Sequence, residues 1–192
     1  MSTHRNLILV RHSAPEIAEA IPPREWQLSE DGRLRCEALV DEIESYRPSL
    51  IATSPEFKAR ETAVLVAAVL GVPILEVEGL HEHERTDASF KPRKEDFRRE
   101  VEAFFSNRER MAFGAETAIR AYARVARAID GLLETVADGN VVAVSHGRVI
   151  ALFTGVRAGV DAYSLWKRLH LPSLVVLSVP GFQLERVVEE VT

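Results

Sequence analysis

Two histidines in this 192-residue chain each follow a short apolar run. Residues 7–10 lead into Arg11-His12-Ser13, and residues 141–144 lead into Ser145-His146-Gly147. Apolar runs of this length that are rich in β-branched residues are typical of strands buried on both faces of a parallel sheet. Ligands of open α/β sheets bind at the carboxyl ends of such strands. We therefore expect both histidines at one ligand-binding edge of a sheet.

A cation and a carboxylate follow two other strand candidates. Lys58 comes after the apolar run at residues 50–53, in the opening turns of a helix for which Ser54 is the predicted N-cap and Glu56 lies beside the positive end. Glu82 follows a third strand candidate. The same edge of the sheet should therefore carry both signs of charge.

These residue types suit the transfer of a phosphoryl group. A neutral imidazole at His12 can attack phosphorus in line. Arg11, Lys58 and a protonated His146 can hold the equatorial oxygens and stabilise their charge. A carboxylic acid at Glu82 can protonate the leaving oxygen and later activate water. None of these steps calls for a metal or another cofactor.

Each feature by itself has a plainer interpretation. A histidine at a strand end is often structural, and Lys58 with Glu61 fits an ordinary pair on a helix surface. His81 and His83 can share one face of an extended segment and bind a metal, but no third ligand stands at a recognisable spacing. The occurrence of two matching histidine motifs favours the catalytic interpretation.

The rest of the chain predicts the elements that position these residues. Helical spacing of apolar residues indicates helices after Ser29, after Ser54 and from Ala118, with Phe57 and Val64 among the inward positions of the second helix. Strands that alternate with helices predict a three-layer α/β fold, with helices on both faces of a mostly parallel sheet.

The domain organisation follows from length and local composition. The length suits a single domain over residues 1–192. Residues 83–114 are dense in charge and carry an amphipathic stripe, which predicts a small helical insertion over the C-terminal strand ends.

Composition limits the partners and the location. A net charge of −5 favours no nucleic-acid surface. The single Cys36 excludes an intrachain disulfide and fits a reducing compartment. No apolar run is long enough to span a membrane, and the first strand begins too early for a signal peptide, so we expect a cytoplasmic protein. The sequence leaves the oligomeric state open, with a dimer as one possibility.

Five motifs stand in the order and context of a known family. They are Arg11-His12-Ser13, Leu28-Ser29-Glu30-Asp31-Gly32, the segment 53–63 (TSPEFKARETA), Leu80-His81-Glu82 and Ser145-His146-Gly147. With them the chain resembles the histidine phosphatase superfamily, which has a phosphoglycerate mutase-like fold, over nearly its full length. The resemblance implies a phosphohistidine at His12, a phosphate pocket that includes Arg11 and His146, and Glu82 as proton donor.

Three departures from the family pattern affect the expected site. Ser13 replaces a glycine, and its hydroxyl either donates to the phosphate or narrows the pocket. Lys58 replaces the pocket arginine, which gives a point charge instead of a bidentate fork, with Arg60 as the alternative cation. Residues 14–18 replace a polar segment of the mutases, which favours a phosphatase. Gly147 still permits close approach of an anion to a helix start.

The sequence thus predicts a metal-independent phosphatase that hydrolyses a small phosphorylated substrate through a phosphohistidine on His12. One alternative is a phosphotransferase of the phosphoglycerate mutase type, which product analysis distinguishes. The other is a catalytically weak protein that binds a phosphorylated ligand, which tight binding without turnover would indicate. Substrate identity should depend on residues 14–27 and 83–114, in which the sequence shows no recognisable code.

Overall fold

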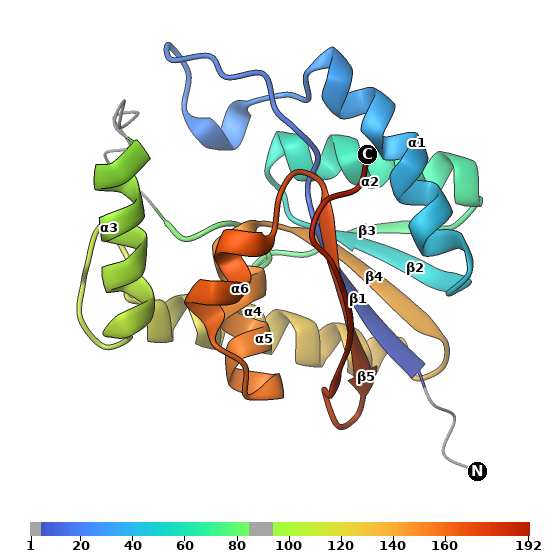
Figure 1. Ribbon diagram of the computed structural model, residues 1–192. Helices are drawn as coiled ribbons and strands as arrows, with labels where there is room; N and C mark the ends of the chain where they lie inside the picture. The colour runs from blue at the N-terminus through green and yellow to red at the C-terminus, as the bar shows by residue number, and fades with distance from the viewer. Residues whose placement is uncertain (1–4, 85–93) are drawn as a thin grey trace.

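The computed structural model describes residues 5–84 and 94–192, with the side chain of residue 94 left out. The elements, in chain order, are β1 (Arg5–Arg11), the 3-10 helix η1 (Pro23–Glu25), α1 (Glu30–Glu44), β2 (Pro48–Thr53), α2 (Phe57–Leu70), β3 (Ile74–Glu76), α3 (Lys94–Ser106), α4 (Ala118–Thr135), β4 (Asn140–Ser145), α5 (Gly147–Ala158), α6 (Ala162–Arg168), β5 (Ser173–Val179) and β6 (Leu184–Val188). The strands of the described residues form one sheet in the order β3-β2-β4-β1-β5-β6 (Figure 1). All neighbouring pairs from β3 to β1 are parallel, whereas β5 runs antiparallel to both β1 and β6. The predicted mostly parallel sheet is confirmed.

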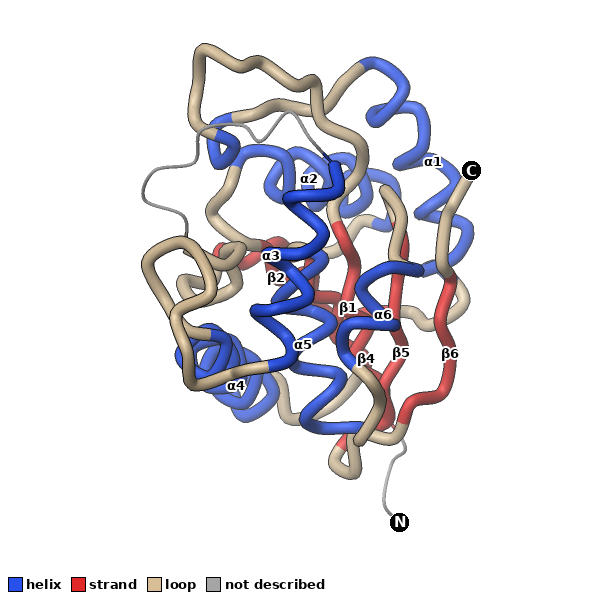
Figure 2. The backbone as a smooth tube through the Cα atoms, turned by 60° about the vertical axis from the view of Figure 1, so that its left-hand side comes forward, coloured by secondary structure: helices blue, strands red, loops and turns tan. Residues whose placement is uncertain are grey.

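Helices cover both faces of the sheet. Helices α1 and α2 lie on one face, and α4, α5 and α6 lie on the other (Figures 1 and 2). Because successive side chains of a strand point to opposite faces, Ile8 and Val10 pack beneath α1 and α2, whereas Leu7 and Leu9 pack toward the other layer. The three-layer arrangement expected from the sequence is therefore present.

The strand registers bring the predicted site residues together. Arg11 stands opposite Ser145 in the β1–β4 pair, and Thr53 stands opposite Val144 in the β2–β4 pair. The three parallel strands consequently end at nearly the same level. The residues that directly follow these strands therefore meet at one edge of the sheet, where His12 and His146 lie.

A glycine allows the chain that leaves β1 to pack on the start of α1. A Cβ at Gly32 would lie 2.1 Å from the carbonyl oxygen of Ala14, a distance that backbone atoms cannot tolerate. The Ser29 hydroxyl accepts a hydrogen bond from Gly32 N at 3.0 Å, so Ser29 is the N-cap of α1, as predicted. This packing fixes the path of the segment that follows His12.

The start of α2 differs from the sequence prediction. Its N-cap is Glu56 rather than Ser54. The Ser54 N–H donates to Val144 O at 2.9 Å, so Ser54 is still hydrogen-bonded to β4 directly after the end of β2, and the helix begins only at Phe57. Ser54 and Glu56 therefore both precede the helix and lie at the edge of the sheet where His12 and His146 meet.

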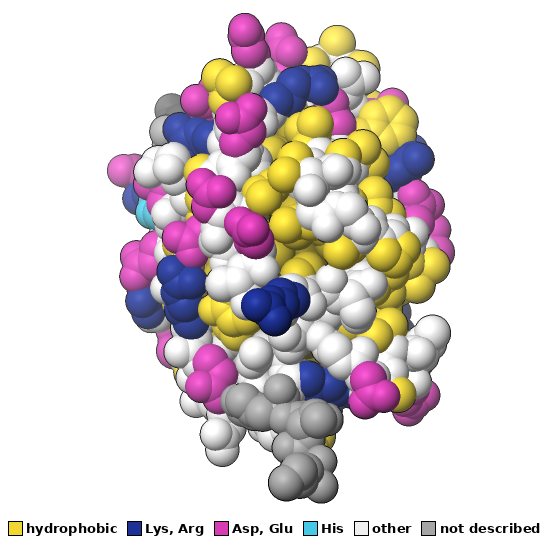
Figure 3. All heavy atoms as spheres, turned by 90° about the vertical axis from the view of Figure 1, so that its right-hand side faces the viewer, with side chains coloured by type: hydrophobic (Ala, Val, Ile, Leu, Met, Phe, Trp, Pro, Cys, Tyr) yellow, Lys and Arg dark blue, Asp and Glu magenta, His cyan; other side chains and the backbone are white. Residues whose placement is uncertain are grey.

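The outer face of α2 is more apolar than the sequence suggested. Phe57 and Val64 are 44% and 52% exposed, so the prediction that they face inward was wrong. The core side of the helix is formed by small residues, Ala59, Ala63 and Ala67, and Phe57 and Val64 lie on the opposite side. Figure 3, which draws the right-hand side of the view in Figure 1, shows a group of exposed hydrophobic side chains.

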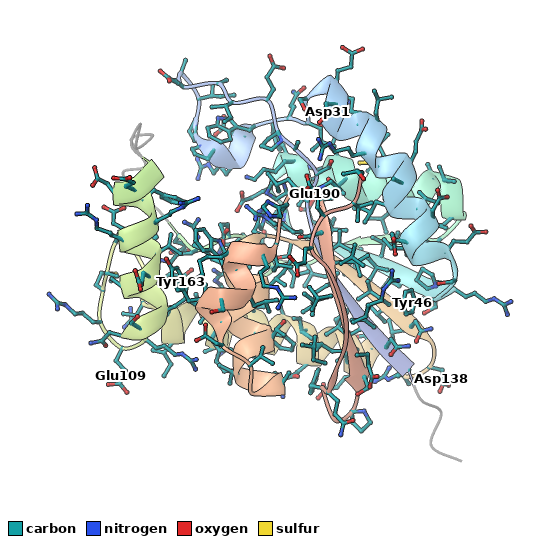
Figure 4. The ribbon with its side chains drawn as sticks, viewed as in Figure 1. Asp31, Tyr46, Glu109, Asp138, Tyr163 and Glu190 are labelled. Atoms are coloured by element: carbon teal, nitrogen blue, oxygen red, sulfur yellow. The ribbon has the colours of Figure 1, made fainter. Side chains whose placement is uncertain are left out.

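Helix α3 packs beside α6 and near the start of α5. The rings of Phe105 and Tyr163 lie 6.1 Å apart, and Figure 4 shows Tyr163 on the side of α6 that faces α3. The guanidinium of Arg148, at the start of α5, lies 5.7 Å from the centre of the Phe97 ring. Since α5 begins where β4 ends, α3 contacts the carboxyl edge of the sheet. None of the helices in the described segments combines the length and apolar character needed to cross a bilayer.

Candidate active site

His12 has a defined tautomer at the end of β1. Its Nδ1 lies 2.7 Å from the carbonyl oxygen of Ser13. A carbonyl only accepts, so Nδ1 carries the proton and Nε2 keeps its lone pair. Burial, together with the charges of His146, Lys58 and Arg11, lowers the pKa of His12 well below its usual value. The ring is therefore neutral near neutral pH, and its Nε2 lone pair is available.

His146 stands next to His12, with ring centres 5.1 Å apart. Its Nε2 lies 2.8 Å from Ser54 Oγ and 3.5 Å from Glu56 Oε1. Burial lowers the pKa of His146 to about 4, and the nearby Glu56 carboxylate only partly offsets this. The ring is therefore neutral in this site, in contrast to the protonated imidazole expected from the sequence.

Arg11 is held by the backbone around α5 and α6. It donates from Nη1 to the carbonyl oxygen of Leu169, and its Nε is buried without a hydrogen-bond partner among the described residues. A Cβ at Gly147 would lie 3.0 Å from the guanidinium carbon of Arg11. In this structure, Gly147 thus makes room for Arg11 itself. Burial lowers the pKa of Arg11 to about 10, which still leaves a cation at neutral pH.

The Ser13 side chain is turned toward α1. Its hydroxyl donates to Gly32 O at 2.6 Å, and its backbone N–H donates to Thr62 Oγ1 at 3.0 Å. The one hydroxyl proton is therefore used within the fold. This arrangement offers a ligand neither the hydroxyl nor the backbone N–H of Ser13.

The two candidate cations of α2 lie in different environments. Lys58 is 6% exposed, and its ammonium donates to Pro23 O at 2.8 Å and to a carboxylate oxygen of Glu56. The Arg60 side chain is 52% exposed and pairs with Glu76. Lys58 is therefore the α2 cation placed at the strand ends.

Glu56 is a site residue that the sequence analysis did not identify. Its Oε1 accepts a hydrogen bond from Glu82 N at 2.8 Å, while Oε2 contacts Lys58. Burial opposes its ionisation, but the electrostatic effect of the His146 ring, together with the charge and the hydrogen bond of Lys58, outweighs burial and lowers the pKa of Glu56. The signal available in the sequence was a carboxylate two residues before Lys58.

Glu82 faces the start of α5. Its Oε1 accepts from His83 N at 2.9 Å, and its Oε2 lies 3.4 Å from both the backbone N and the Nε of Arg148. Burial by itself would raise the pKa of Glu82, but the Arg148 charge prevails and holds it far below the usual range. The sequence analysis expected an anion near the start of α5, and in this structure the Glu82 carboxylate lies there.

Arg148 is a second residue that the sequence analysis missed. It is 5% exposed, and its guanidinium lies 5.7 Å and 5.6 Å from the ring centres of Phe97 and Phe113. Its Nη1 is buried and has no hydrogen-bond partner in the described chain. The available signal was a cation directly after the His146-Gly147 motif.

The segment that carries Glu82 is tied to α4 and β4. Arg124 donates to the carbonyl oxygens of Gly79, His81 and Glu82 at 2.7, 2.9 and 3.3 Å. Ser145 Oγ donates to Leu80 O at 2.6 Å. These bonds fix the backbone on both sides of the Glu82 side chain.

The neighbouring histidines are separated by the fold. His83 is buried, with its ring 4.3 Å from that of Phe104 and its Nε2 2.9 Å from Glu116 O. His81 instead pairs with Glu84. Among the residues that the structure describes, no three His, Cys, Asp or Glu side chains are grouped to hold a metal ion.

A surface hollow of about 330 Å³ lies away from these groups. It is lined by Gln27, Phe57, Arg60, Glu61 and Val64, on the outer side of α2. Of the candidate site residues, only Arg60, the alternative cation, lines it. The chemistry available at the strand ends therefore comes from two neutral imidazoles, three cations and two carboxylates, which together can bind an anion beside a nucleophile.

Comparisons with known proteins identify the family and the fold of the chain. The family model described as histidine phosphatase superfamily (branch 1) matches residues 7–188. The fold is similar to YhfR of Bacillus stearothermophilus, with a TM-score of 0.77, 20% identity and 98% of each chain covered. It is also similar to a mycobacterial glucosyl-3-phosphoglycerate phosphatase in complex with inorganic phosphate, with a TM-score of 0.75, 21% identity, and 96% of this chain and 95% of that chain covered.

A phosphoglycerate mutase is similar to about the same degree. The enzyme from Bacillus anthracis str. Sterne gives a TM-score of 0.74 at 16% identity, with 98% of this chain and 94% of that chain covered. No match is found among curated protein sequences. Likeness at these identities concerns the fold, and the neighbours include both phosphatases and mutases.

Proposed function

Because the chain belongs to branch 1 of the histidine phosphatase superfamily, we propose that it is a phosphatase that hydrolyses a small phosphomonoester through a phosphohistidine on His12. The observation that carries the proposal is the hydrogen bond from His12 Nδ1 to Ser13 O at 2.7 Å. It leaves the lone pair of Nε2 free beside the cations of Arg11 and Lys58. An in-line attack on phosphorus needs a nucleophile of this kind.

The charges around His12 support a phosphate pocket. Arg11 and Lys58 supply fixed positive charge, and neutral His146 supplies a ring N–H once its tautomer suits the ligand. Ser13 and Gly147 are left out of the proposed pocket, because they bond to α1 and accommodate Arg11, respectively. The pocket thus has fewer donors than the sequence predicted.

Glu82 has two roles in the proposed reaction. In the free site Glu82 is a carboxylate and has no proton of its own to donate. A proton that arrives with the substrate therefore passes through Glu82 to the leaving oxygen. The carboxylate then accepts a proton from the water that attacks the phosphohistidine. Phosphate, neutral His12 and protonated Glu82 result, and Glu82 then releases its proton to solvent, which restores the carboxylate of the free site.

The direct test is hydrolysis of an aryl phosphate, measured with a chelator present and across pH for the wild type and His12→Ala. We expect turnover in the wild type and a loss of at least about 10³-fold in the variant, since the nucleophile is removed. Intact-mass spectrometry under alkaline quench should show a phosphorylated wild type and an unmodified variant. Turnover retained by His12→Ala would rule out the mechanism.

Transfer of the mutase type is the second candidate. His12 is only 6% exposed, and burial of this kind shields a phosphohistidine from water. Incubation with a phosphoglycerate separates the two, because a mutase yields the isomer whereas a phosphatase yields glycerate and free phosphate. A cytoplasmic location stays a prediction from the sequence.

A further inference from the structure

A carboxylate stands where the proposed site must receive an anion. The Glu56 side chain is 12% exposed and contacts Lys58, the α2 cation of the pocket, through Oε2. Its Oε1 lies 3.5 Å from His146 Nε2. Any phosphoryl oxygen that accepts hydrogen bonds from both Lys58 and His146 therefore lies beside Glu56.

Glu56 cannot easily turn away from this position. Its Oε1 also accepts the Glu82 N–H at 2.8 Å, and its backbone N–H donates to Ser54 Oγ at 3.2 Å. The carboxylate is thus held by the backbone of Glu82 and by the ammonium of Lys58. Turning the side chain away would leave the part-buried N–H of Glu82 without its acceptor.

Two anions in contact repel each other unless a proton lies between them. A phosphate monoester loses its second proton near pH 6, so about neutral pH it readily takes that proton back in a suitable site. An O–H···O⁻ bond of this kind is short and strong. The Lys58 ammonium on one side of Glu56 and neutral His146 on the other are compatible with such a bond.

We propose that Glu56 is a specificity-determining residue: it binds the phosphoryl group through a proton shared by the two oxygens, and so selects anions that can carry a proton. One proton from solvent enters with each phosphate dianion, an O–H bond forms, and no other covalent bond changes. Sulfate has the same shape and carries no proton near neutral pH, so the site should reject it. The inference rests on the proposed function in that the same pocket receives the phosphoryl group.

Other charged groups face the site from each neighbouring element. They are Arg11 and His12 from β1, Lys58 from α2, Glu82 from the segment after β3, and His146 and Arg148 from the start of α5. His12, His146 and Glu82 are other groups able to take up a proton when an anion binds. The test must therefore separate Glu56 from these groups.

Titration calorimetry with inorganic phosphate at about pH 8, in two buffers of different ionisation enthalpy, counts the protons taken up. We expect about one proton per phosphate for the wild type and close to none for Glu56→Gln, which cannot share a proton with an anion in this way. The wild type should prefer phosphate to sulfate by at least about tenfold, and the variant should bind the two anions almost equally. Glu76→Gln is the matched control, because it removes one carboxylate that pairs with Arg60 outside the site.

Two results would overturn the inference. One is phosphate binding by the wild type without proton uptake, and the other is uptake retained in Glu56→Gln, which would assign the proton to another group of the site. Should Glu56→Gln not fold, Glu56→Asp keeps the charge but withdraws the carboxylate, and its anion preference should fall toward equality. Phosphate binding is measured without turnover, so the inference can fail while the phosphatase holds, and the phosphatase can fail while the inference holds.

Discussion

At the scale of single residues, the site differs from the family pattern in its balance of charge. Lys58 replaces an arginine, and Glu56, two residues before it, contacts its ammonium. A lysine presents a compact charge that one carboxylate oxygen can match, whereas an arginine fork has further donors left for a ligand. Lys58 and Glu56 lie in one stretch of sequence, and both act on the position where the phosphoryl group is expected.

A first prediction concerns which α2 cation serves the reaction. Lys58→Ala should lower kcat/KM by about 10²–10³, the usual loss when one charge-stabilising donor is removed from such a site. Arg60→Ala should change it less than about threefold, because exposed ion pairs of the Arg60–Glu76 kind contribute little. Steady-state kinetics on an aryl phosphate give both values.

The Lys58 variant needs its own control, since it leaves the Glu56 carboxylate without its cation. The double variant Lys58→Ala/Glu56→Gln removes both charges. If the double variant regained full activity, the loss in the single variant would reflect the uncompensated Glu56 charge rather than a missing phosphate donor. A larger effect of Arg60→Ala would assign the pocket cation to Arg60.

At the scale of elements, α4 determines where Glu82 stands. Arg124, in the second turn of α4, donates to three carbonyl oxygens of the segment 79–82 and pairs with Glu116. These bonds restrict a segment that would otherwise follow β3 as an unconstrained loop. Helix α4 thus positions Glu82 through the Arg124 side chain, which binds backbone carbonyl groups of the segment 79–82 and does not contact the expected ligand.

We predict that Arg124→Met loosens this segment. The loss of several hydrogen bonds from a charged donor should lower the free energy of unfolding by about 2–3 kcal/mol and kcat by about tenfold or more. Rescue by Arg124→Lys should be partial, because an ammonium cannot reproduce the planar fork. Arg120→Met, on the exposed side of the same helix, is the control and should behave like the wild type. An unchanged kcat in Arg124→Met would show that Glu82 does not need this support.

At the scale of the whole molecule, the burial of ionisable groups links stability to pH. His12 and His146 have lowered pKa values in the folded protein, and so have Glu56 and Glu82. In each case the unfolded chain binds protons more readily than the folded one as the pH falls. Acid should therefore destabilise this fold well before the ordinary carboxylates titrate.

This gives a prediction for denaturant unfolding. For His146, stability is complete above the unfolded pKa of 6.5 and is lost as the pH falls from there toward about 4. Each such histidine contributes a slope of up to about 1.4 kcal/mol per pH unit in this window. We expect the free energy of unfolding to drop between about pH 7 and 5, and to drop less steeply in His146→Gln. Equal stability at both pH values would contradict the burial of neutral histidines.

The sequence by itself determined the strands, the strand ends and most of the site. Apolar runs that stop at Arg11-His12 and at Ser145-His146 are local patterns, and local patterns suffice to place residues at the carboxyl edge of a parallel sheet. The family motifs added the roles of Lys58 and Glu82 as expectations. The start of α2 was misplaced by two residues, because the bond from Ser54 N to Val144 O is not encoded near Ser54.

Only the tertiary structure decided how these groups are paired. That Ser13 bonds to Gly32, that Gly147 accommodates Arg11, and that Glu56 meets Lys58, His146 and Glu82 N are contacts between segments far apart in the chain. The ionisation of each group follows from those contacts and from burial, and neither is readable from residue spacing. For that reason the sequence named the groups that can bind a phosphoryl group, whereas the fold decided which of them are neutral, which are charged and which are already bonded to other parts of the protein.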